Sequence, residues 1–81
     1  MKAKEAIEAV KTNPELVARC ADEQLALYRV GPREGNALDW WQKVAAGWDR
    51  IGPLSYYELE SLLITQHGAN AEWDVVEASK V

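Results

Sequence analysis

The stretch from Asn36 to Pro53, NALDWWQKVAAGWDRIGP, holds three of the chain's four tryptophans and constrains the fold more than any other segment. Asn36 is a good helix N-cap, and Gly52 followed by Pro53 is a typical helix stop. At about 100° per residue, the apolar residues of this stretch cover roughly 180° of a helix, whereas packing on one neighbour needs only about 100°. The pattern therefore predicts a central helix over 37–51 that contacts several neighbours or a second chain.

Two N-terminal segments also show helical periodicity. Residues 2–12 place apolar side chains at the i, i+3, i+4 and i+7 positions of an amphipathic helix. Residues 14–30 form a similar pattern after the Asn13-Pro14 break, with Cys20 near the middle of an apolar arc of roughly 140°. We therefore expect two helices here, and a buried thiol that packs as a small hydrophobic side chain.

A capping box gives the best local start signal in the chain. Ser55-Tyr56-Tyr57-Glu58 has the S-x-x-E pattern, in which the first and last side chains satisfy each other's backbone N–H groups. It predicts a helix over 56–67 that ends at Gly68. Tyr57 and Ile64 are seven residues apart on this helix and lie away from its core face, where they either meet the C-terminal segment or stay exposed.

The last segment, 70–81, is compatible with two structures. Asn70 can cap a helix, whereas Trp73-Asp74-Val75-Val76 can pair as a short strand. The abundance of Ala and Glu favours the helix. We therefore predict an all-α fold, a single helical domain over 1–81 with four main helices and a short C-terminal helix.

Composition limits the environment and the partners. One cysteine allows no intrachain disulfide, and no segment approaches the roughly 18 apolar residues of a membrane span, so we expect a cytoplasmic protein with no membrane partner. The net charge is −4, and residues 53–81 carry five acids against Lys80 alone. An acidic surface favours partners with a basic surface.

The sequence shows little catalytic chemistry. The single histidine, His67, ends a predicted helix, and Ser55 is committed to capping, so no nucleophile has a base in reach. The glycines fit no phosphate-binding loop, and no ligand set for a metal is evident. We predict no catalytic residues, no cofactor and no metal, and hence a protein that is not an enzyme.

A helix-turn-helix nucleic-acid-binding domain is one alternative, because the helix from Ser55 and a helix from Ala71 would flank a short turn with Gly68. The second helix would carry Glu72, Asp74 and Glu77 against Lys80, which would repel phosphate, so we do not expect a nucleic-acid partner. The remaining bases would form a patch only if folding gathers them. They are Arg19, Arg29, Arg33, Lys43 and Arg50.

The leading hypothesis is a small, acidic, non-enzymatic protein-protein interaction module. It would act as a regulator or inhibitor, for example as a mobile-element or phage-type accessory protein that blocks a basic surface. Tryptophan and tyrosine are common interface anchors, and acids would form the rim. The candidate partner-binding residues are Trp40, Tyr57, Glu60, Ile64, Glu72, Trp73 and Asp74. A structural homo-oligomer is the other alternative, and Gly47 inside the tryptophan stretch predicts close packing of a crossing helix or a second subunit.

Overall fold

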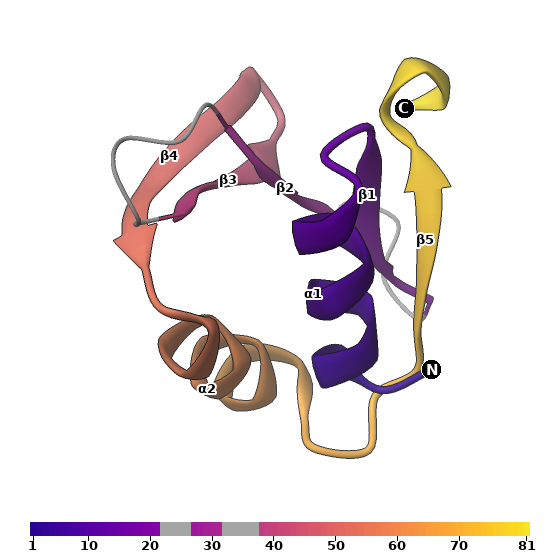
Figure 1. Cartoon of the computed structure of the whole chain (residues 1–81), viewed down its shortest axis with the longest axis vertical. Coiled ribbons are helices and arrows are strands. Elements are labelled where there is room, and N and C mark those ends of the chain that lie inside the picture. The colour runs from indigo at the N-terminus through magenta and orange to yellow at the C-terminus, as the bar shows by residue number, and fades with distance from the viewer. Residues whose placement is uncertain (22–26, 32–37) are drawn as a thin grey trace.

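The computed structural model describes residues 1–21, 27–31 and 38–81, which form two α-helices and one five-stranded sheet (Figure 1). All strand pairs are antiparallel, and the strand order is β4-β3-β2-β1-β5. The fold is therefore a mixed α/β domain with an open sheet, and the predicted all-α bundle is wrong. The elements are α1 (Ala3–Thr12), β1 (Leu16–Cys20), β2 (Leu27–Val30), β3 (Leu38–Val44), β4 (Gly47–Leu54), α2 (Tyr56–His67), β5 (Trp73–Glu77) and a 3₁₀ turn (Ala78–Lys80).

The two helices with clear local signals are confirmed. α1 falls within the predicted range 2–12, and α2 matches the range 56–67. The Ser55 hydroxyl accepts the Glu58 backbone N–H at 3.2 Å, and the Glu58 carboxylate accepts the Ser55 N–H at 3.1 Å. Gly68 ends the helix with φ at 97°. These helices are encoded locally, because their caps and periodicity need no distant partner.

The tryptophan stretch forms a hairpin, so the predicted helix over 37–51 is wrong. Val44 pairs with Gly47 across a two-residue turn. Gly47 adopts φ of 141°, which a non-glycine residue rarely adopts, and the space where a Cβ would stand is open. The predicted close packing of a crossing helix of this chain on Gly47 is therefore wrong as well, since glycine is needed there for the turn. Asn36, the predicted cap, lies outside the described residues.

The other two predicted helices are also strands. The segment 14–30 contains β1 and β2, and the predicted C-terminal helix over 70–81 is β5 followed by a 3₁₀ turn. β5 pairs with β1 along its whole length, from Leu16 opposite Glu77 to Cys20 opposite Trp73. This pairing outweighs the helix propensity of Ala and Glu, because propensity is a weak prior against tertiary contacts. It also removes the second helix that a helix-turn-helix requires.

Both helices pack on the same face of the sheet. Their buried residues meet alternate strand residues in one core (Figure 1). Trp40 and Trp73 are its largest side chains, and Cys20 is buried among them with a free thiol, as predicted. The core consists of Ala3, Ala6, Ile7, Val10, Ala18, Cys20, Tyr28, Val30, Trp40, Leu59, Leu63 and Trp73.

The opposite face, which we call the helix-free face, carries the intervening residues of each strand. Cross-strand pairing brings Trp41 between Arg29 and Arg50, and pairs Lys43 with Trp48. The register shifts between Trp40 and Trp41, where β4 contributes an extra residue. The described residues of this face are Val17, Arg19, Leu27, Arg29, Asp39, Trp41, Lys43, Trp48, Arg50, Asp74 and Val76.

Candidate functional site

α2 presents an outward stripe because its opposite side is anchored in the core. Leu59 and Leu63 are fully buried. Tyr57 and Ile64, at positions i and i+7, therefore point outward with 78% and 37% of their surfaces exposed. Tyr57 is the most exposed large hydrophobic side chain among the described residues, and the prediction that it lies off the core is confirmed.

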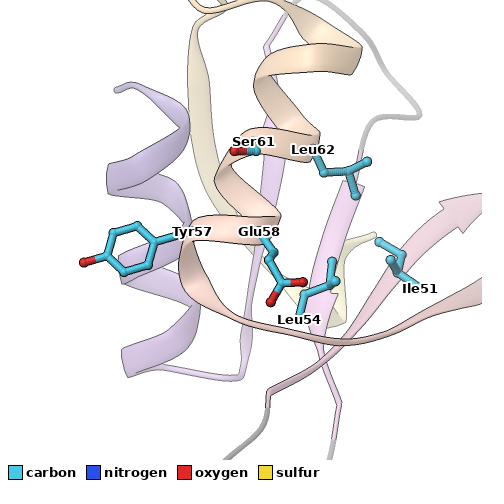
Figure 2. Close-up of a pocket in the computed structure, with 6 residues that line it drawn as sticks. All are labelled: Ile51, Leu54, Tyr57, Glu58, Ser61 and Leu62. Atoms are coloured by element: carbon cyan, nitrogen blue, oxygen red, sulfur yellow. The ribbon is translucent and has the colours of Figure 1, made fainter.

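A groove of about 510 Å³ lies between α2 and the end of β4, beside Tyr57. Figure 2 shows Ile51 and Leu54 of β4 facing Leu62 of α2, with the Glu58 side chain close to Leu54. Ile51 is the extra residue that β4 contributes at the register shift, and it packs against the edge of the core. The groove is therefore apolar, with polar side chains at its margin.

Tyr57 also borders a second hollow, of about 330 Å³, towards α1. In Figure 2 its ring extends away from Ile51, on the side where α1 lies. The Tyr56 ring meets it edge-on, with centroids 5.4 Å apart and an interplanar angle of 85°. Lys11 lies 5.8 Å from the Tyr56 ring centroid. An amphipathic anchor on a supporting ring is the kind of residue that carries energy at interfaces.

α2 contributes negative charge beside the groove. It contains Glu58, which lines the groove, and Glu60, and no lysine or arginine, whereas Lys4 and Lys11 of α1 line the second hollow. The Ser55 side chain, and then its backbone N–H, hold the pKa of the Glu58 carboxyl below its usual value. Burial raises the pKa of Tyr56, and the neighbouring Glu60 carboxylate raises it further. A basic group on a partner would therefore be favoured beside this apolar groove.

Two predicted partner-binding tryptophans lie in the core instead. Trp40 is 0% and Trp73 is 2% exposed, so neither is available to a partner. Trp73 contacts His67 edge-on at 5.4 Å between centroids, and Tyr28 at 5.9 Å. Among the described residues, neither indole N–H has a hydrogen-bond partner. Their bulk stabilises the fold, which the helical interpretation of the tryptophan stretch did not predict for Trp40.

The predicted acidic rim is divided. Glu72 binds the N-terminal ammonium at 3.2 Å and Lys2 at 3.1 Å. Asp74 binds Arg19 through two hydrogen bonds of 3.0 and 2.6 Å on the helix-free face. The pKa values of both carboxyls are lowered, chiefly by these hydrogen bonds. Only Glu60 of the predicted acids lies on α2 with Tyr57 and Ile64.

The helix-free face holds two tryptophans of the stretch that was predicted to form a central helix. Trp41 and Trp48 lie there, both partly exposed. The Arg29 guanidinium carbon stands 4.6 Å from the Trp48 ring centroid, and the Lys43 ammonium 5.7 Å. The alternation Asp39-Trp41-Lys43, with Trp48-Arg50, is the signal that would have found this cluster. It was obscured because Trp40 and Trp41 are adjacent and occupy both faces.

The chemistry within reach of the groove is limited. In the ranges 1–21, 27–31 and 38–81, no group of three or more His, Cys, Asp or Glu residues is arranged to hold a metal ion. The His67 Nε2 lies 2.7 Å from the Tyr28 hydroxyl, in a partly buried contact between α2 and β2.

No protein-family model matches this chain, and no curated protein or solved structure matches it. Within the described part of the chain, both helices are too short or too polar to cross a lipid bilayer.

Proposed function

We propose that this chain is a non-enzymatic protein-interaction module that binds a partner segment in the groove between α2 and β4. One observation carries the proposal: Tyr57 is 78% exposed and borders an apolar groove of about 510 Å³. Burial of apolar surface drives most protein association, and tyrosine anchors are enriched among residues that dominate binding energy. A regulator or inhibitor that holds another protein in this way fits the small size of the chain.

The charges around the groove define the expected partner. Glu58 and Glu60 stand on α2 without a basic residue on the same helix. A partner segment with one or two large apolar side chains and a nearby Lys or Arg would fill the groove and meet these carboxylates. Such a segment is common on basic protein surfaces, so the proposal retains the expected basic partner but places it on α2.

Selection of phage-displayed random peptides on the immobilised protein tests this proposal. We expect enriched peptides that combine aromatic or aliphatic residues with Lys or Arg. Their affinity should fall about thirtyfold or more for Tyr57→Ala, because anchor residues cost at least about 2 kcal/mol on truncation. Thr65→Ala is the matched control, since Thr65 is an exposed residue of the same helix that does not line the groove.

The outcome that contradicts the proposal is equally specific. Selected peptides that are acidic, or that bind Tyr57→Ala and the unchanged chain equally, would rule out this groove as the partner site. A photo-crosslinking residue at position 57, with position 65 as control, then captures the partner in the source cell. Light scattering measures self-association. If the unsubstituted chain is a dimer and the Tyr57→Ala variant is a monomer, the groove would be assigned to a second copy of this chain.

A further inference from the structure

The helix-free face gathers basic and aromatic side chains that are far apart in the sequence. Arg29 of β2, Trp41 and Lys43 of β3, and Trp48 and Arg50 of β4 lie on adjacent strands of one sheet. The pairings Arg29–Trp41, Trp41–Arg50 and Lys43–Trp48 alternate an aromatic ring with a cation in every case. We call these five residues the Trp41–Trp48 cluster.

Two cations of the cluster are held by rings rather than by carboxylates. Arg29 and Lys43 both lie over the Trp48 ring, at 4.6 and 5.7 Å from its centroid. Among the described residues, neither makes an ion pair with a carboxylate. Arg50 binds Asp39 at 2.7 Å. A cation on an indole keeps its charge available for an incoming anion, because the ring quadrupole does not neutralise it.

The charge of this face is opposite to that of the whole chain. Its described residues include four cations and two carboxylates, which leaves it at net +2. The remainder of the sequence has five Lys and Arg against eleven Asp and Glu, so it is net −6. The fold thus segregates basic from acidic side chains, which the net charge of −4 conceals.

The partly exposed aromatic rings of the face lie on β3 and β4. On the β1 side, Val17 and Leu27 are 0% and 5% exposed, and Arg19 is committed to Asp74. Trp41 and Trp48 keep partial exposure on the other side. The Trp41 ring is positioned by Gly31, where a Cβ would overlap the indole. The cluster therefore occupies the β2–β4 half of the sheet, and Gly31 fixes the position of its Trp41 ring.

We propose that the Trp41–Trp48 cluster binds single-stranded nucleic acid. Bases would stack on the exposed parts of the two indoles, and phosphates would pair with Arg29 and Lys43. Sheets that bind single strands combine aromatic stacking platforms with cations that follow the backbone, and the stacking tolerates any base. Aromatic rings set between cations favour this occupant over an acidic protein segment, which offers carboxylates but no planar bases.

Anisotropy of a fluorescein-labelled oligothymidylate of about 12 nucleotides, at low salt, tests the proposal on the full chain. We expect a plot of the logarithm of the affinity against the logarithm of the salt concentration to fall with a slope of about −1.4, for about two phosphate contacts on a single strand. Trp48→Ala should weaken binding about fivefold or more, as for one lost base stack. Lys43→Ala should make the salt slope about 0.7 less steep.

Matched controls separate this surface from the rest of the molecule. Lys11→Ala removes an exposed lysine of α1 and should leave the affinity and the slope unchanged. Tyr57→Ala should also leave oligonucleotide binding intact. A negative oligonucleotide result would therefore not bear on the α2 groove, and a negative peptide result would not bear on the Trp41–Trp48 cluster. Circular dichroism checks that Trp48→Ala folds. If Trp48→Ala does not fold, Lys43→Glu, which should abolish binding, replaces it.

Three results would overturn the proposal. The first is an unchanged anisotropy at low salt for the unsubstituted chain. The second is equal loss of binding in the Lys43→Ala and Lys11→Ala variants, which would indicate nonspecific attraction. The third is equal competition by polyglutamate or by duplex DNA of the same length, which would assign the face to acidic proteins or to general polyanion binding.

Discussion

Trp40 and Trp41 are adjacent in the chain and lie on opposite faces of the same strand. Trp40 is 0% exposed in the core under the helices, whereas Trp41 lies partly exposed between Arg29 and Arg50. A strand turns successive side chains to opposite faces, so neighbours of the same type enter different environments. β3 therefore fills the core with its helix-covered face and leaves Trp41 partly exposed on its helix-free face.

The two tryptophans should differ most in their effect on stability. We expect Trp40→Ala to lower the free energy of unfolding by about 3–5 kcal/mol, because it leaves a cavity in a small core. Trp41→Ala should cost about 1–2 kcal/mol, since its ring is partly hydrated. Urea unfolding measures both. Equal losses in the free energy of unfolding would show that the two faces of β3 contribute alike to stability.

Gly31 lies against the Trp41 ring on the helix-free face. A Cβ on Gly31 would overlap the Trp41 indole, so Gly31→Ala must displace the ring. We expect a loss of about 1–3 kcal/mol, as for overpacked sites. The double variant Gly31→Ala with Trp41→Ala should lose less than the sum of the two single variants. Strict additivity in urea unfolding would mean that Gly31 and Trp41 are not in contact.

The Arg19–Asp74 pair on the same face predicts a pH dependence of smaller size. The Arg19 hydrogen bonds lower the pKa of Asp74 in the folded chain below its unfolded value. Its stabilisation is therefore complete above the unfolded pKa and is lost as the pH falls through the folded pKa. Unfolding midpoints of wild type and Asp74→Asn should differ at neutral pH and converge below about pH 4.

Glu77→Gln is the control for this measurement. Glu77 is an exposed residue of the same strand, and its nearest cation, the Lys80 ammonium, is 3.9 Å away. Its midpoint should follow that of the wild type across the pH range. A difference between wild type and Asp74→Asn that widens in acid would contradict the assignment of the lowered pKa to Asp74.

Tyr57→Ala should have the smallest effect on stability, within about 0.5 kcal/mol, because its ring is largely exposed. Thermal unfolding checks this directly. Together with a large loss of peptide binding, it would identify Tyr57 as a residue used for a partner rather than for folding. A substantial loss of stability would instead place Tyr57 with Trp40, as part of the structure.

The candidate surfaces were predictable to different degrees. Tyr57, Glu60 and Ile64 were predicted together because a capping box fixed the phase of α2 from four consecutive residues. The Trp41–Trp48 cluster was not predicted, although the bases Arg19, Arg29, Lys43 and Arg50 were recognised as a conditional patch. Strand pairing places these four bases on the helix-free face, so folding does gather them. Arg33 lies outside the described residues.

The sequence alone determined α1 and α2 and placed Tyr57 off the core, because caps and helical periodicity act within a few residues. Only the tertiary structure decided that the residues of β1, β2, β3, β4 and β5 are strands. A strand satisfies its backbone through neighbours distant in the chain, and β1 finds β5 more than fifty residues away (Figure 1). The adjacent tryptophans Trp40 and Trp41 gave no clean alternation, so the face of each was decided by the register of its pairing.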